Sequence, residues 1–160
     1  MGYKRGSYRY FAEQDLLDIK NNLTSDYYSP ETVCYHSEQY AEKMCKDKLV
    51  EYGVDPDWIH KIYRLLIHIG EVFSIDVPER ILDCGMILDQ NYQISRYPVR
   101  EEDMTEDTTL STDDAELAFE CACSISDWLQ TIPSPDYQME TIKSTNLKGK
   151  ITCFFQSRRF

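Results

Sequence analysis

Four polar residues near position 40 follow one another at helical spacing and could together bind a ligand. They are His36, Gln39, Lys43 and Asp47. Residues three or four positions apart share one side of a helix, so a helix here would carry all four on one face. Much of the apolar set of the same segment falls on another face: Val33, Tyr40, Ala41, Met44, Leu49 and Tyr52. The segment therefore predicts a helix with a core side and with a polar side that could hold a ligand or a partner.

The spacing of apolar residues predicts five helices, and the second of them carries this polar face. We expect the first helix over residues 8–23, where apolar residues recur every three or four positions. The second should begin after Ser29, a favoured capping residue, with Pro30 at its first position. It should end at Gly53.

The third and fourth helices are delimited mainly by prolines. The third should start at Asp55 or Pro56 and run to about Ile69. The fourth should follow Pro78 and end before Pro98, because a proline pushes the preceding residue out of the helical region.

The fifth helix follows an acidic segment, residues 100–116, whose first half we interpret as a loop. Ser111 or Thr112 can cap this helix, and acids in its first turn would face the positive end of the helix dipole. Residues 133–160 are weakly specified and are expected to form a basic tail or a small hairpin, separate from a helical part at residues 1–132.

The formal net charge of -11 hides an asymmetry along the chain. Residues 143–160 contain five basic and no acidic side chains, whereas residues 1–142 contain 12 basic and 28 acidic ones. An anionic body repels phosphate backbones, which proteins bind mainly through Lys and Arg. Nucleic acid is therefore disfavoured as a constant partner.

The spacing of the six cysteines argues against a metal-binding protein, and the lack of long apolar runs argues against a membrane protein. No two cysteines form a C-x-x-C pair and no His lies at zinc-site spacing, so we interpret them as reduced core residues and expect neither a metal nor a cofactor. We find no apolar run of membrane-spanning length and no signal peptide, and we expect a cytoplasmic protein.

Four short segments, in a fixed order, carry a resemblance to a known family. They are Phe11-Ala12 with Asp15-Leu16, Tyr35-His36 with Gln39 and Ala41-Glu42-Lys43, Ile59-His60-Lys61-Ile62, and Asn91-Tyr92-Gln93-Ile94-Ser95-Arg96-Tyr97-Pro98. The set resembles the HEPN domain family, all-α up-and-down bundles found in higher eukaryotic and prokaryotic nucleotide-binding proteins. The resemblance covers about residues 8–131 and implies an all-α up-and-down helical bundle of about five helices.

One branch of that family binds nucleotides or supports a minimal nucleotidyltransferase encoded beside it, often as a toxin-antitoxin pair. The resemblance implies such a binding module here, as a homodimer, with a ligand site made by His36, Gln39, Lys43, His60, Arg96 and Tyr97. The chemistry of these groups agrees: Lys43 and Arg96 can contact phosphate, and Gln39 can hydrogen-bond. The exposed ring expected at Tyr97 can stack on a base.

Two alternative functions stay open at this stage. The ribonuclease branch of the family carries an Arg followed, after four to six residues, by a His. Here Arg64 and His68 are separated by three residues, although on a helix they would share a face. A metal-independent endoribonuclease toxin using this degenerate pair is one alternative, and a purely regulatory interaction protein is the other.

The candidate residues also have purely structural interpretations. Neighbouring protein groups could satisfy His36 and His60, as happens for most buried polar groups. Glu42 and Lys46 lie four residues apart and are expected to form a solvated pair. Arg96 could pair with an acid of the first helix.

Overall fold

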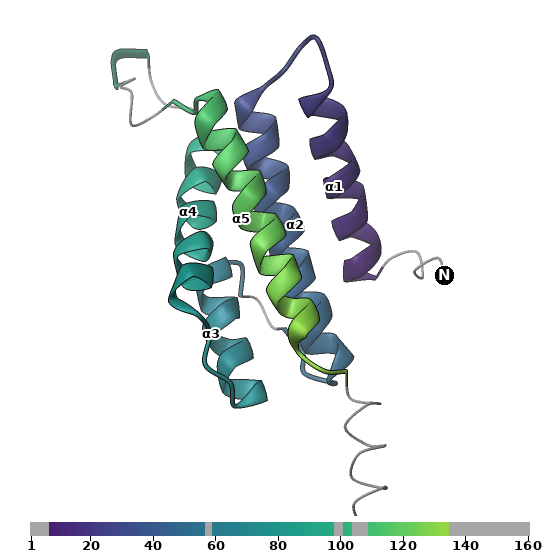
Figure 1. Cartoon of the computed structure of the whole chain (residues 1–160). Helices are drawn as coiled ribbons and strands as arrows, with labels where there is room; N and C mark the ends of the chain where they lie inside the picture. Colours follow the sequence, from purple (N-terminus) through teal and green to yellow (C-terminus); the bar gives the residue numbers. More distant parts are fainter. Residues whose placement is uncertain (1–6, 57–58, 98–100, 104–108, 135–160) are drawn as a thin grey trace, which may run out of the picture. The chain divides into compact units, whose positions relative to one another are not determined.

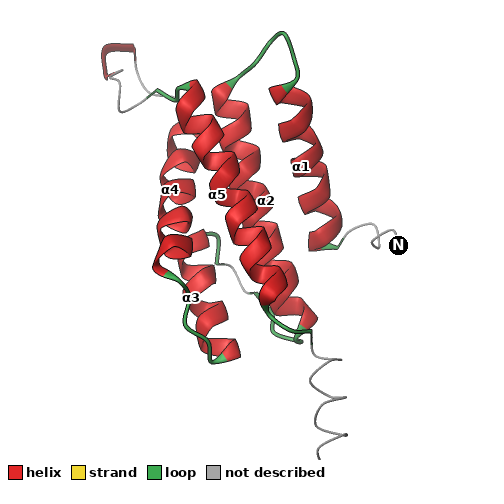
Figure 2. Ribbon diagram, viewed as in Figure 1, coloured by secondary structure: helices red, strands yellow, loops and turns green. Residues whose placement is uncertain are grey.

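The described part of the protein consists of helices and the loops that join them. The computed structural model describes residues 7–56, 59–97, 101–103 and 109–134. These residues contain five α-helices, one short 3-10 helix and no strand. Figure 2 draws the helices in red and the connecting loops in green. The helices are α1 Tyr8–Leu23, α2 Pro30–Glu51, α3 Ile62–Phe73, α4 Glu79–Arg96, η1 Glu101–Asp103 and α5 Thr112–Thr131. The prediction of an all-α chain of about five helices is confirmed.

Helix α2 lies at the centre of the arrangement. Helices α1, α3 and α4 each pack against it, and the Tyr40 hydroxyl donates a hydrogen bond to Ser126 of α5 at 2.9 Å. Figure 1 shows α2 between α1 and α4, with α5 in front of it. Every residue from Thr32 to Leu49 is buried or half-buried. The polar side chains of α2 therefore need partners inside the protein, because burying an unpaired polar group is costly.

Local capping signals place the starts of two helices where the sequence predicts them. Ser29 Oγ accepts a hydrogen bond from the Thr32 backbone N–H at 3.3 Å, and Pro30 occupies the first position of α2. Before α5, Ser111 Oγ accepts from the Asp114 N–H at 3.2 Å, and Asp114 accepts from the Ser111 N–H at 2.8 Å. These reciprocal bonds satisfy backbone donors that a helix leaves free at its start.

The predicted start of the third helix is wrong. The sequence places it at Asp55 or Pro56, but α3 begins at Ile62. The Asp89 carboxylate of α4 accepts hydrogen bonds from the Ile62 N–H at 2.8 Å and from the Tyr63 N–H at 3.2 Å. A side chain from another helix thus caps α3, so the start of α3 carries no local capping signal.

Helices α3 and α4 approach each other closely at Gly85. A Cβ atom on Gly85 would lie 2.9 Å from Leu66 Cδ1 and 3.2 Å from the Tyr63 backbone nitrogen. Real Cβ atoms essentially never show the 2.9 Å approach, so a side chain at this position would force Leu66 or the neighbouring α3 backbone to shift. The close contact holds the start of α3 beside the Asp89 carboxylate that caps it.

The cysteines of the described residues are free thiols. Cys34, Cys45, Cys84 and Cys121 are buried, Cys123 is half-buried, and none of these five forms a disulfide. The interpretation as reduced core residues is confirmed for the four buried ones. Cys153 lies outside the described residues.

The chain divides into two compact units, residues 1–130 and residues 131–160. The first contains α1 to α4 and nearly all of α5. The expected tail or hairpin lies, from residue 135 onward, outside the described residues, as do residues 104–108 of the expected acidic loop. Among the helices described, none is long and apolar enough to cross a lipid bilayer.

Candidate ligand-binding site

Helix α1 supplies a carboxylate that two basic residues of α2 share. Asp15 Oδ1 lies 2.9 Å from His36 Nδ1, and Asp15 Oδ2 forms an ion pair with the Lys43 ammonium. The side chains of His36, Asp15 and Lys43 are 22%, 10% and 23% exposed. The predicted polar face of α2 therefore packs against α1 and keeps limited contact with solvent.

Gln39 links this ion pair to two further acids of α2. Lys43 Nζ donates to Gln39 Oε1 at 3.3 Å. Gln39 Nε2 donates to Glu38 Oε2 at 2.8 Å and reaches Glu42 Oε2 at 3.5 Å. The amide thus has one end on a cation and the other end on two carboxyl groups.

Glu42 is the second shared carboxylate. Its Oε1 atom lies 2.5 Å from Lys46 Nζ and 3.2 Å from His60 Nδ1. The Lys46 side chain is only 6% exposed, so the expectation that Glu42 and Lys46 form a solvated pair is wrong. Lys46 lies beside the Tyr8 ring of α1, and this packing removes the pair from water. The His60 side chain, in contrast, is 68% exposed.

These contacts form one continuous set of side chains, which we call the polar network. Its members are Asp15, His36, Glu38, Gln39, Glu42, Lys43, Lys46 and His60. Three of the six residues predicted as ligand-binding belong to it from α2, and His60 joins it from the segment before α3.

The acids of the polar network do not all carry charge near neutral pH. Burial raises the pKa of Glu38 to about 8, although the Gln39 hydrogen bond and the Lys43 charge work in the opposite direction. Asp15 and Glu42 are then the carboxylates that balance Lys43, Lys46 and any proton on the two imidazoles. Each carboxylate is shared by two basic side chains, so four basic groups meet two carboxylates.

Asp47, the fourth residue of the predicted face, has a separate role. It lies 3.4 Å from Arg9 Nε and accepts a hydrogen bond from the Arg9 backbone N–H at 3.2 Å. Burial raises the pKa of Asp47 even though the Arg9 charge lowers it. The pair fixes the start of α1 to α2.

Arg96 and Tyr97 lie at the end of α4, next to a small aromatic cluster. The rings of Tyr35 and Tyr92 stack with centroids 6.2 Å apart, and the Arg96 guanidinium lies 5.3 Å from the Tyr92 centroid. Arg96 also donates to the Tyr92 hydroxyl, so its observed contact is within its own helix and not with an acid of α1. The rings of Tyr35 and His36 pack edge to face with their centroids 5.1 Å apart, and this contact connects the cluster to the polar network. Tyr97 is 56% exposed.

Arg64 and His68, the candidate nuclease pair, lie on α3. Arg64 is exposed, and His68 Nδ1 lies 3.8 Å from Glu71 Oε2. The ionic neighbour of this imidazole is thus a solvent-exposed carboxylate three residues further along the same helix. Arg64 and His68 share a helix face, as their spacing predicts.

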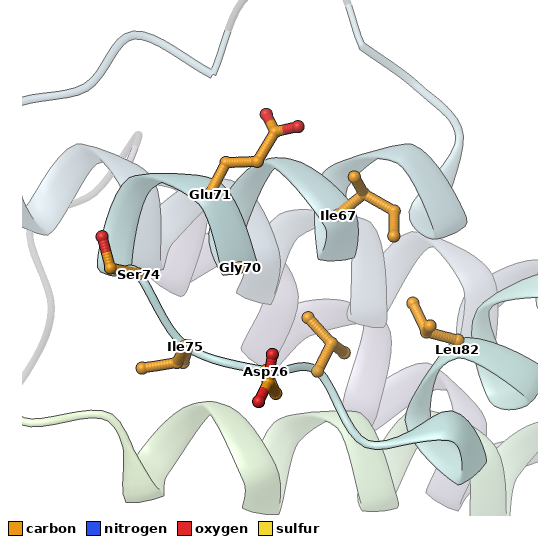
Figure 3. A pocket seen from close by; sticks show the side chains of 8 residues that line it. Ile67, Gly70, Glu71, Ser74, Ile75, Asp76 and Leu82 are labelled. Carbon is orange, nitrogen blue, oxygen red and sulfur yellow. The ribbon is translucent and has the colours of Figure 1, made fainter.

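A hollow of about 440 Å³ lies between the end of α3 and the start of α4, as Figure 3 shows. Apolar side chains such as Ile67 and Leu82 line it together with the acids Glu71 and Asp76. A hollow with acids as its charged groups is unsuited to phosphate. The basic groups gathered around α2 are the better candidate site for an anion.

Sequence reasoning missed half of the polar network. Asp15 is among the family landmarks without a role, Glu38 is unassigned, and Glu42 and Lys46 are expected to form a solvated pair. The available signal was their position: charged residues that fall among the apolar positions of a helix need partners when the helix is central.

Fold and site together define a class of protein: an all-α bundle whose central helix carries a buried network of acids and bases. The protein-family model of the HEPN domain matches residues 8–132 of this sequence. This chain belongs to the HEPN domain family.

Two solved structures are similar to the chain. The archaeal HEPN homologue ST0689 is 30% identical with a TM-score of 0.58, and the match covers 78% of this chain and 93% of that one. The protein TT1696 from Thermus thermophilus is 24% identical with a TM-score of 0.61, and the match covers 79% of this chain and 98% of that one. The second similarity concerns the fold alone. No curated protein matches the chain.

Proposed function

We propose that this chain is a binding module whose ligand is a nucleotide, with the phosphates held at the polar network. The observation that carries the proposal is the sharing of Asp15 and Glu42, each between two basic side chains. Because two carboxylates serve four basic side chains, these side chains keep nitrogen atoms that can contact a bound anion. Phosphate oxygens are suited to such a site because charge-assisted hydrogen bonds are strong.

The geometry leaves specific atoms to meet the ligand. His36 and His60 both turn Nδ1 to a carboxylate, so Nε2 of each ring is the atom left for a phosphate oxygen. Lys43 is 23% exposed and has donors beyond those used by Asp15 and Gln39. We propose Arg96 and Tyr97 as an outer part of the same site, reached through Tyr35 and Tyr92.

Isothermal titration with ATP, GTP and their monophosphates tests the proposal. We expect heat from the wild type and at least tenfold weaker binding by His60→Ala, whose exposed side chain can be removed with little effect on packing. Arg64→Ala, which removes an exposed basic side chain on α3, serves as the control and should bind as the wild type does. Absence of heat at millimolar protein would overturn nucleotide binding.

The same proposal includes a protein partner, a minimal nucleotidyltransferase, and a homodimer. A tagged copy recovered from its native host should bring down a small nucleotidyltransferase in stoichiometric amount, with and without RNase. Light scattering should give about twice the chain mass of 18.8 kDa. A monomer mass would overturn the dimer.

RNA cleavage would favour the endoribonuclease alternative. The decisive result is cleavage that His68→Ala abolishes while the helical circular dichroism signal is unchanged.

A further inference from the structure

We infer that the nucleoside part of the ligand occupies a hollow at the Lys46 end of the polar network. The inference rests on the proposed function and adds the place and the orientation of the bound nucleotide. The hollow has a volume of about 360 Å³ and is lined by Tyr8, Val50, Gly53, Val54, Asp55 and Pro56. It lies where the start of α1 meets the end of α2.

The hollow adjoins the polar network through Tyr8. Lys46 Nζ lies 5.9 Å from the centroid of the Tyr8 ring and 2.5 Å from Glu42 Oε1. The same Glu42 oxygen lies 3.2 Å from His60 Nδ1. One ammonium group thus contacts both the aromatic wall of the hollow and the shared carboxylate of the network.

The lining suits a flat, partly apolar group joined to an anion. Tyr8 and Val50 are 37% and 49% exposed, so their apolar surface is open to a ligand. A Cβ atom on Gly53 would meet nothing within 4 Å, so the wall is also open on that side. Asp55 adds an exposed carboxylate, an acceptor for sugar hydroxyls. An aromatic ring face, an acceptor for hydroxyl groups and neighbouring basic side chains together match the base, the sugar and the phosphates of a nucleotide.

The opposite end of the network is less suited to a base. Tyr35 and Tyr92 already stack on each other, and Arg96 lies over Tyr92. Tyr8 also has a cation, Lys46, over its ring, but no described aromatic ring stacks on it. The stretch of α2 from His36 to Lys46 is about 15 Å long. We therefore place the phosphates along this stretch and the base at Tyr8, which is the end opposite to Tyr97.

Variants that fill the hollow test the place of the nucleoside separately from phosphate binding at the polar network. Val50→Trp places a large ring in the hollow at a half-exposed position, while Leu117→Trp makes a matched change on α5, at a residue that is 44% exposed. Titrations use ATP and inorganic tripolyphosphate as probes. We expect Val50→Trp to weaken ATP binding about 10- to 100-fold, as loss of base stacking would, and to leave tripolyphosphate binding unchanged. Leu117→Trp should change neither.

A second pair of variants covers the case in which Val50→Trp does not fold. Tyr8→Phe keeps the aromatic face and should bind ATP as the wild type does, whereas Tyr8→Ala should bind ATP at least tenfold more weakly. Tyr8→Phe, which keeps the ring beside Lys46, should also leave tripolyphosphate binding unchanged. Unchanged ATP affinity in Val50→Trp or Tyr8→Ala would overturn the place of the nucleoside and leave phosphate binding intact. If the wild type binds neither probe, the proposed function falls and this inference with it.

Discussion

Replacing Glu38 by Gln should remove a strong pH dependence of stability. Glu38 is 2% exposed, and burial raises its pKa from 4.5 to about 8. The unfolded chain loses this proton near pH 4.5, but the folded chain keeps it to about pH 8. Between these values the folded state binds more protons, so stability falls as pH rises.

The size of the effect follows from the shift. A difference of one pKa unit corresponds to about 1.4 kcal/mol, so the full shift corresponds to roughly 5 kcal/mol, of which about 1.4 kcal/mol is lost per pH unit inside the window. Glu38→Gln has no proton to lose and keeps an oxygen for the Gln39 amide. Between pH 5.5 and pH 7.5 the free energy of unfolding of the variant should therefore rise by roughly 3 kcal/mol relative to that of the wild type.

Urea denaturation followed by circular dichroism measures this difference at a fixed protein concentration. The groups that face Glu38, namely Asp89, Glu42 and Lys43, are present in both proteins, so their contributions largely cancel. Glu13→Gln, at an exposed position of α1, is the control and should parallel the wild type. The reasoning would be refuted if the free energies of unfolding of Glu38→Gln and the wild type differed by the same amount at every pH from 5.5 to 7.5.

Three further predictions concern the fold. Asp89→Ala should destabilise the protein by about 1–3 kcal/mol in urea denaturation, because two N–H groups of α3 lose their acceptor; exposed Asp83→Ala should change stability by less than about 0.5 kcal/mol. Gly85→Ala should cost about 1–3 kcal/mol, since its Cβ would clash with Leu66, and an unchanged melting curve would contradict this. Ser29→Ala should cost about 1 kcal/mol through loss of the cap on α2, whereas Ser29→Asp should retain most of the stability.

Helix starts show how far local sequence determines this fold. Ser29 with Pro30, and Ser111 with Asp114, lie within four residues of the backbone groups that they satisfy. Such signals are complete in the sequence, and the two helices begin where it predicts. The start of α3 depends on Asp89, 27 residues away, and no local pattern reveals that bond.

The candidate site divides in the same way. Helical periodicity by itself placed His36, Gln39 and Lys43 on one face, because spacing along a helix is a local property. Only the tertiary structure decided what that face meets: Asp15 reaches it from α1, 21 residues before His36, and the surrounding helices bury Lys46 with Glu42. The sequence determined the helices and the polar face of α2. Packing of the other helices around α2 turned that face into the polar network. The reason is burial, because each buried charge needs a partner from another turn or another helix.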